Sequence, residues 1–253
     1  MECQPEAYET IAAEVQNAAK DEGYKAWVGV PEFLFDVPEP VLIDHYVQST
    51  LKELKKKGFT GENVFLAAHS LGGVMTQIYS KSRTDIKGQI LMGSVLLRNT
   101  RSLTDEGRTE FKAGVPPTLT LVGEKDGLLR ITRGAESYWH QTKNIVDSQA
   151  NKFPVVALEG MSHASFMDSS MLPSGVTDSD LKPEVEEKAA HEAIAKEMVG
   201  FFGQVLQKKE ANYDSTEELF KPLLAGLELE GSYALKPACY NSKLLNPDDP
   251  KCS

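Results

Sequence analysis

Residues 63–73 read Asn-Val-Phe-Leu-Ala-Ala-His-Ser-Leu-Gly-Gly, and this stretch decides how the chain folds. The continuous apolar run at 63–68 is typical of a buried strand in a parallel sheet. The residues from 72 to about 81 predict a helix that begins on two glycines. Ser70 therefore stands on a tight strand-to-helix turn, where its hydroxyl is expected to lie above the sheet.

This turn has the composition that a nucleophilic serine needs. It follows the G-x-S-x-G elbow pattern, with alanine in place of the first glycine. The small residues Ala68, Gly72 and Gly73 allow the neighbouring backbones to approach each other. The helix N-terminus directs backbone N–H groups at developing negative charge, and the Leu71 amide is the expected oxyanion donor. We therefore interpret Ser70 as the candidate nucleophile.

The remainder of the chain predicts strands that alternate with helices. Further strands are expected at residues 25–30, 88–94, 117–122 and 154–158, and helices at 6–21, 39–57, 131–143, 183–208 and 216–227. This alternation implies βαβ units and an α/β fold, with a mostly parallel central sheet flanked by helices on both faces. The polar segment 97–114 is too short for a large lid. We expect one domain over residues 1–212, with residues 213–253 a C-terminal extension that packs on the same domain.

Two other strand ends carry a candidate acid and a candidate base. The sequence Leu-Val-Gly-Glu-Lys-Asp-Gly at 121–127 places Asp126 just after a strand, with Glu124 as the alternative acid. A carboxylate at that point can accept a hydrogen bond from an imidazole and fix its tautomer. The sequence Leu-Glu-Gly-Met-Ser-His at 158–163 presents His163 on a glycine loop. Open α/β sheets place their sites at these strand ends, so His163 is the candidate base.

The other four histidines are interpreted differently. His45 and His191 lie within helical patterns and His140 lies at the end of one, so we expect surface or packing roles for them. His69 adjoins the serine and is expected to shape the site. The apolar residues near the strand ends are pocket candidates, although each is equally compatible with buried core. The candidate pocket residues are His69, Leu97, Leu128 and Phe166, together with Leu96, Leu129 and Met167.

Composition restricts the partners. Acidic residues outnumber basic ones by 37 to 27, a net charge of -10 that disfavours nucleic acid. No apolar run approaches the roughly 20 residues of a membrane helix. No secretory signal is visible after Met1, so the default location is cytoplasmic, or secreted or organellar if a leader has been removed. Cys3, Cys239 and Cys252 lack a CxxC partner or an adjacent histidine, which disfavours a metal site, whereas a Cys239–Cys252 disulfide stays open.

The order Ser70, Asp126, His163 is the order of the α/β-hydrolase triad. From its first helix to about residue 207, the chain resembles α/β-hydrolases, and it is similar to small cap-poor esterases and dienelactone-hydrolase-like members. The stretches Gly-Glu-Lys-Asp-Gly-Leu and Gly-Met-Ser-His-Ala-Ser-Phe lie where that family carries its acid and its base. The resemblance implies a serine hydrolase that cleaves small-molecule carboxylic esters through an acyl-enzyme, without a cofactor or metal.

The chain departs from the family pattern at its start. Members usually begin with two or three strands and a loop that supplies the second oxyanion N–H, whereas this chain begins near the helix that follows that loop. The fold is therefore expected to be N-terminally short, with an open sheet edge. Backbone groups around Cys3 and Gln4 are the remaining donor candidates. The alternatives are a non-catalytic or weakly active binding protein on the same fold, and a peptidase, amidase or thioesterase.

Overall fold

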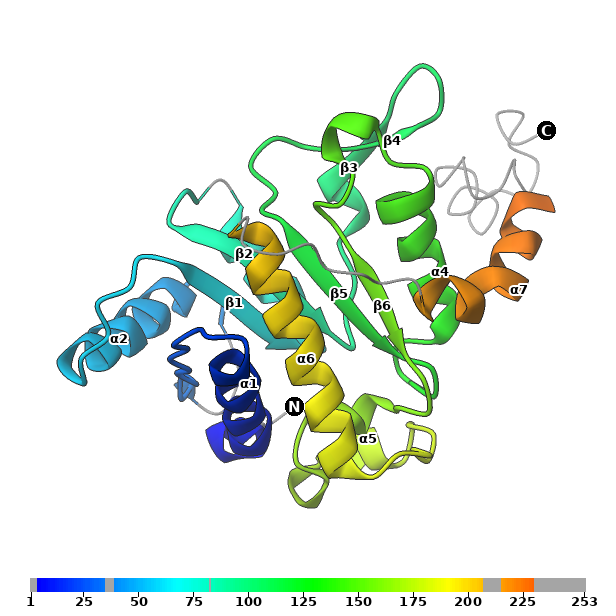
Figure 1. Ribbon diagram of the computed structural model, residues 1–253. Coiled ribbons are helices and arrows are strands. Elements are labelled where there is room, and N and C mark those ends of the chain that lie inside the picture. The colour runs from blue at the N-terminus through cyan, green and yellow to red at the C-terminus, as the bar shows by residue number, and fades with distance from the viewer. Residues whose placement is uncertain (1–3, 35–38, 82, 207–214, 230–253) are drawn as a thin grey trace.

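The computed structural model describes residues 4–34, 39–81, 83–206 and 215–229. Its centre is a four-stranded, wholly parallel sheet in the order β1-β2-β5-β6 (Figure 1). The strands are β1 (Val64–His69), β2 (Ile86–Met92), β5 (Thr118–Gly123) and β6 (Val155–Leu158). Helices cover the sheet on both faces, which confirms the predicted α/β class.

The register of the strands brings their carboxyl ends to one level. His69 at the end of β1 pairs with Met92, and Met92 pairs with Leu121 of β5. Gly123 at the end of β5 pairs with Leu158 at the end of β6. The loops that follow β1, β5 and β6 therefore open at the same edge of the sheet. These are the loops that carry the candidate serine, acid and base.

The two faces of the sheet are covered by different helices. Helices α1 (Glu9–Asp21) and α6 (Glu187–Val205) lie together on the face turned towards the viewer in Figure 1. Helix α3 (Leu71–Ser80) packs on β1 and β2 on the other face. Helices α4 (Ile131–Tyr138) and α7 (Ser215–Leu229) pack there against β6. The layers are thus helix, sheet and helix.

Successive side chains of β5 point to opposite faces of the sheet. Leu121 packs with Phe201 in the core beneath α1 and α6. Val122, the next residue, packs with Phe220 of α7 and residues of α4. All four side chains are fully buried, and each contributes about 1.5–3 kcal/mol through removal of apolar surface from water.

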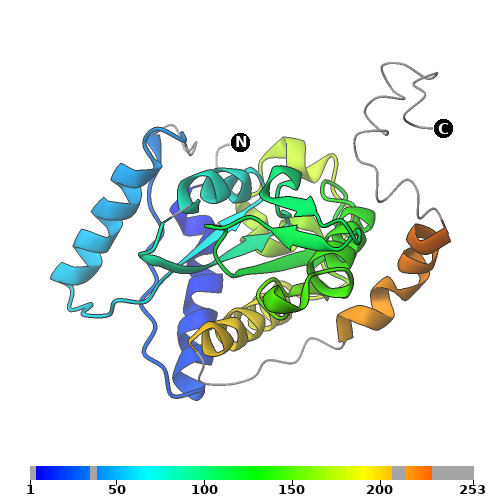
Figure 2. The ribbon, with the colours of Figure 1, turned by 90° about the horizontal axis from the view of Figure 1, so that it is seen from above.

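The expected strand at 25–30 does not form. Residues 24–33 have no regular secondary structure, although Tyr24, Ala26 and Val28 pack on the core beneath α1 and α6. The segment is short and apolar and is followed by Pro31, which favours a strand, but a strand also needs a neighbour for its backbone hydrogen bonds. Within the described residues, β1 pairs only with β2, and α2 (Ile43–Lys56) stands beyond β1 (Figure 2).

Several local elements differ from the predicted ones. The segment 97–114 contains an antiparallel hairpin of β3 (Arg101–Leu103) and β4 (Thr109–Phe111), anchored by the buried Phe111 ring. The helix expected at 131–143 changes from α4 to a π-turn at Trp139–Lys143. The other short helices are η1 (Pro5–Tyr8), η3 (Arg98–Thr100), η5 (Asp147–Gln149), η6 (His163–Phe166), η7 (Ser169–Met171) and α5 (Ser174–Thr177).

Helix α7 belongs to the segment proposed as a C-terminal extension. Phe220 and Leu224 pack in the core with α4 and β6, and the hydroxyl of Thr216 accepts a hydrogen bond from the Ala157 amide at 3.1 Å. These contacts attach the helix to the outer strand of the sheet. Cys3, Cys239 and Cys252 lie outside the described residues, as does the disulfide proposed between the last two.

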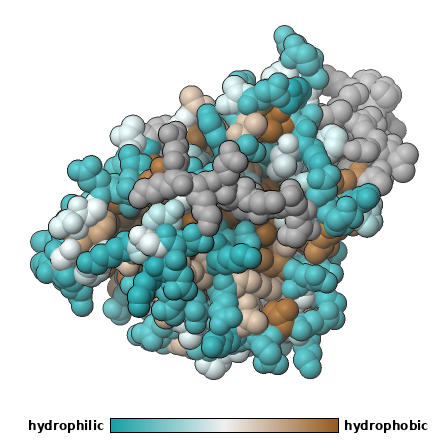
Figure 3. Space-filling model, viewed as in Figure 1, coloured by the Kyte–Doolittle hydropathy of each residue, from teal (hydrophilic) through white to brown (hydrophobic). Residues whose placement is uncertain are grey.

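The coloured part of the face shown in Figure 3 is mostly polar. Hydrophilic residues cover most of the surface over α1 and α2 on the side shown in Figure 3. Among the described helices, none combines the length and the apolar character that crossing a bilayer would require.

Candidate active site

Ser70 has a strained backbone. Its φ of 52° and ψ of -125° lie in a region that residues with a side chain rarely adopt. Such a conformation costs of order 1–3 kcal/mol and persists only where the surroundings impose it. Ser70 stands between the last residue of β1 and the first residue of α3, so the strand-to-helix turn forces this geometry. This is the elbow geometry that the sequence pattern predicts.

Backbone contacts hold the turn in place. The Ser70 amide donates to the carbonyl oxygen of Met92 at 2.9 Å, and the Gly73 amide donates to the Ser70 carbonyl at 3.0 Å. A Cβ on Gly73 would lie 2.5 Å from the hydroxyl oxygen and 2.7 Å from the Cβ of Ser94, so α3 lies too close to the segment after β2 for a side chain at this position. A Cβ on Gly72 would make an ordinary contact of 3.6 Å with Ala68. The close approach therefore depends on Gly73 more than on Gly72.

Asp126 and His163 form a buried hydrogen-bonded pair. Asp126 Oδ2 lies 2.7 Å from His163 Nδ1, and the two residues are 3% and 1% exposed. The other oxygen, Oδ1, accepts hydrogen bonds from the amides of Leu128 at 2.9 Å and Leu129 at 2.6 Å. Both oxygens of this carboxylate are thus engaged, which fixes its orientation. Glu124, the alternative acid, instead accepts from the Gly160 amide.

The pairing defines which nitrogen of His163 can act as a base. A carboxylate accepts hydrogen bonds, so the proton of the neutral imidazole lies on Nδ1 and the lone pair on Nε2. Nε2 is buried and makes no hydrogen bond with any described residue, Ser70 included. Catalytic hydrogen bonds are commonly loose in unliganded enzymes and tighten when substrate binds.

Glycine gives the imidazole room against β2. Gly93 has a φ of +53°, and a Cβ there would lie 2.9 Å from His163 Nδ1 and 3.3 Å from Asp126 Oδ2. Gly93 directly follows Met92, whose carbonyl binds the Ser70 amide. Consecutive residues at the end of β2 thus contact the serine turn on one side and the acid–base pair on the other.

His69 packs against the candidate base. Its ring centroid lies 4.6 Å from that of His163 and 5.7 Å from that of Phe166, and Tyr8 Oη lies 3.2 Å from His69 Nδ1. Burial, followed by the charge of His163, lowers the pKa of His69 to about 3. His69 therefore stays neutral near pH 7. When His163 becomes protonated, its positive charge is not repelled by a second charged imidazole beside it.

The two oxyanion candidates occupy different environments. Leu71 is the first residue of α3, where the helix leaves its N–H groups without a partner inside the helix, and its side chain is 49% exposed. Gln4 is exposed and precedes η1, whose Ala7 carbonyl accepts from the Asp168 amide at 2.8 Å. That bond connects η1 to the segment that follows the base.

The pocket residues expected from the sequence do not share one environment. Leu97, Leu128 and Leu129 are half-buried. The buried members, Leu96, Phe166 and Met167, are core residues, and Phe166 is 0% exposed. Since a fully buried side chain cannot line an open pocket, the assignment of Phe166 is wrong for this structure. The Phe166 ring packs against the His69 ring instead.

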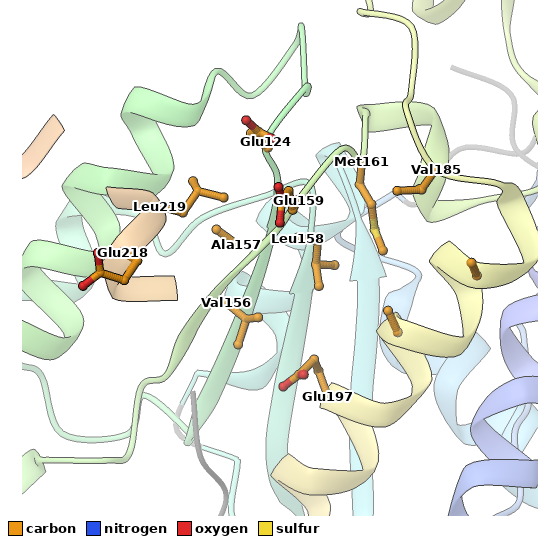
Figure 4. A pocket seen from close by; sticks show the side chains of 12 residues that line it. Glu124, Val156, Ala157, Leu158, Glu159, Met161, Val185, Glu197, Glu218 and Leu219 are labelled. Atoms are coloured by element: carbon orange, nitrogen blue, oxygen red, sulfur yellow. The ribbon is translucent and has the colours of Figure 1, made fainter. Parts of the chain in front are cut away.

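A separate hollow of about 660 Å³ lies beside β6 and does not include the candidate triad. Figure 4 shows apolar side chains of β6 among those that line it, with Glu159 and Glu197 among its carboxylates. Burial raises the pKa of Glu197. Among the described residues, no group of three or more histidine, cysteine or acidic side chains is arranged to hold a metal ion.

The other three histidines occupy different elements of the fold. His45 is exposed on α2, and His191 is buried in α6. His140 is buried in the π-turn, with Nδ1 2.7 Å from the Thr109 hydroxyl. Burial, and then the charge of Arg101, lower the pKa of His140 to about 4.

Because the pKa of the buried His140 is lowered, we expect the folded protein to lose stability in acid. Because the pKa of His140 is lower in the folded chain than the ordinary 6.5, the unfolded chain binds the proton first as the pH falls. Stability is thus complete above pH 6.5 and lost progressively towards pH 4, by about 3 kcal/mol. In urea unfolding, His140→Gln is expected to flatten the pH dependence by that amount. His45→Gln, at an exposed site, should keep the wild-type slope; equal slopes for both variants would contradict the prediction.

Comparison with known families agrees with this geometry. Residues 3–171 match the alpha/beta hydrolase family. The chain belongs to that family. The matched region includes the elbow, the acid loop and the base loop of this α/β-hydrolase. No curated protein sequence matches the chain.

Three residues of this α/β-hydrolase that surround the candidate triad were not predicted from the sequence. Tyr8 and Gly93 contact the imidazoles, and the carboxylate of Asp180 binds the base loop. Tyr8 and Asp180 are distant in sequence from the residues they bind, so no local pattern indicates them. Gly93 lies at a strand end like the others, which is a signal that could have been used.

Proposed function

We propose that this α/β-hydrolase is a serine hydrolase of carboxylic esters, with Ser70 as nucleophile, His163 as base and Asp126 as orienting acid. The observation that carries the proposal is the buried Asp126–His163 pair, which leaves Nε2 as a free base at the sheet edge where Ser70 is strained. Acyl transfer needs a nucleophile, a base and a group that orients the base.

In the proposed reaction, the ester carbonyl binds above Ser70. His163 Nε2 takes the hydroxyl proton while Oγ attacks the carbonyl carbon, and the Leu71 amide stabilises the oxyanion. The imidazolium then protonates the leaving alcohol, and an acyl-enzyme remains. A water molecule, deprotonated by the same nitrogen, attacks the acyl carbon. The imidazolium then returns the proton to Ser70 Oγ as the bond to the acyl group breaks, which releases the acid. Throughout the reaction the Asp126 carboxylate accepts a hydrogen bond from Nδ1–H of His163, and it stabilises the imidazolium.

The environment of His163 allows its imidazole to accept and release a proton during the reaction. His69 stays neutral beside His163 because its pKa is lowered to about 3. A charged His69 would oppose formation of the imidazolium that the reaction requires. We prefer esters to amides because an alcohol leaves more readily than an amine. Thioesters fit the same machinery.

Two measurements test the proposal. The first is hydrolysis of p-nitrophenyl esters of graded chain length, which also sizes the acyl pocket. The second is covalent labelling by a fluorophosphonate, with the modified residue located by mass spectrometry. We expect turnover, and a label on Ser70. A folded wild-type protein with neither turnover nor label would favour a binding protein on the same fold, and faster turnover of thioesters or anilides would reassign the substrate class.

A further inference from the structure

A single carboxylate binds both loops that carry the candidate acid and base. Asp180 lies shortly after α5 and is half-buried. It accepts hydrogen bonds from four backbone amides. Oδ1 accepts from Gly127 at 2.9 Å, His163 at 3.1 Å and Leu181 at 3.0 Å, and Oδ2 accepts from Ala164 at 2.7 Å.

The positions of these donors are informative. Leu181 is next to Asp180 in the sequence, but the other three donors belong to the acid and base loops. Gly127 immediately follows the candidate acid. The remaining two are the candidate base, His163, and the next residue, Ala164. Hydrogen bonds to an ionised carboxylate are roughly twice as strong as neutral ones. Asp180 therefore fixes the backbone next to Asp126 relative to the backbone of His163. The distance between these backbones sets how well the two side chains can pair.

The neighbours of Asp180 make further contacts with the same loops. We call residues 178–185 the strap. A Cβ on Gly127 would lie 2.5 Å from the Ser179 carbonyl oxygen, so the strap lies directly on the acid loop. Glu184 donates its amide to the Gly160 carbonyl at 2.8 Å, and its carboxylate pairs with Lys125 at 2.7 Å. The strap thus contacts the acid loop and the base loop at two points each.

We infer that Asp180 is a positioning residue, which holds the acid loop and the base loop in the geometry that lets Asp126 orient His163. This inference rests on the function proposed above for Ser70, Asp126 and His163. Asp180 lies beyond the matched residues 3–171, so the match to the family does not assign it a role. It contacts backbone amides and takes no part in bond making.

Two substitutions separate the carboxylate from a general structural effect. Asp180→Ala removes all four acceptor contacts. Asp180→Asn keeps one oxygen, but its NH₂ group cannot accept a hydrogen bond from the amide it faces. The matched control is Asp178→Asn, which removes the same charge from an exposed residue of the strap. Melting temperatures of all three variants report whether the fold is retained.

Ester kinetics provide the first readout. Small misplacement of a catalytic group costs up to roughly 10²-fold in rate, so we expect kcat for Asp180→Ala to fall by about 10- to 100-fold. Asp180→Asn should recover part of this loss. KM should stay unchanged in both variants, because Asp180 contacts the loops and no substrate. Wild-type kcat in a folded Asp180→Ala variant would overturn the inference.

Proton NMR provides a second readout that does not depend on turnover. The Nδ1 proton of His163, shared with Asp126, is expected to resonate far downfield in the wild type and in Asp178→Asn. In both Asp180 variants it should move upfield or exchange faster. An unchanged resonance would overturn the positioning role while esterase activity stood. A wild type without activity, but with an Asp180-dependent resonance, would overturn the proposed function and leave the positioning role intact.

Discussion

Ser70→Ala is expected to lower kcat for ester hydrolysis by about 10⁴- to 10⁶-fold, with the protein still folded. The substitution removes the only atom that forms the covalent acyl bond in the proposed mechanism. It also replaces a residue strained at a φ of 52°, and alanine has no better access to that region than serine. Stability should therefore change little. The measurement is p-nitrophenyl ester turnover beside circular dichroism and thermal unfolding.

The same experiment includes the residues that act with Ser70. His163→Ala should lose about as much as Ser70→Ala, and the double variant should be no slower than either, since the groups act as a unit. Ser102→Ala, at an exposed serine of β3, is the matched control and should retain full activity. Additive losses in the double variant would show that the two residues act separately. Full activity of Ser70→Ala would require another nucleophile.

The strands that support the site were predictable because each contains a short apolar run, although Gln89 interrupts β2 and Thr120 interrupts β5. Strands of a parallel sheet are largely covered by helices and leave such runs in the sequence, and β1, β2, β5 and β6 all lie close to the predicted ranges. The candidate residues follow from the strand ends, since the loops after these strands open at one edge. The segment 25–30 shows the limit of this reasoning. Its apolar character is visible locally, whereas the lack of a neighbouring strand among the described residues is a property of the whole fold.

The supporting residues could not be predicted for a related reason. Asp180 binds His163 across 17 positions, and Tyr8 reaches His69 across 61. Neither contact leaves a periodicity or a motif, because both depend on how loops meet after folding. Phe166 illustrates the converse error. It lies next to the base loop in sequence, but packing turned its ring into the core. Sequence distance from a catalytic loop does not determine which side chains reach solvent.

Gly93→Ala is expected to lower kcat/KM by about 10²-fold while leaving the protein folded. The new Cβ would lie 2.9 Å from His163 Nδ1, 3.0 Å from its Cε1 and 3.3 Å from Asp126 Oδ2. At these separations the imidazole has to move, and the pair with Asp126 is disturbed directly. The positive φ of +53° adds roughly 1–2 kcal/mol of backbone strain. Ester kinetics and urea unfolding measure the two effects separately.

Gly107→Ala distinguishes crowding from strain. Gly107 has a φ of +76°, and a Cβ there would meet nothing within 4 Å. It should therefore share the roughly 1–2 kcal/mol loss of stability and keep wild-type activity. The contrast between the two variants isolates the contact with the imidazole, because the backbone penalty is common to both. Equal activity in both variants would mean that His163 adapts to the added methyl group, and that its position in the resting structure is not the one that catalysis requires.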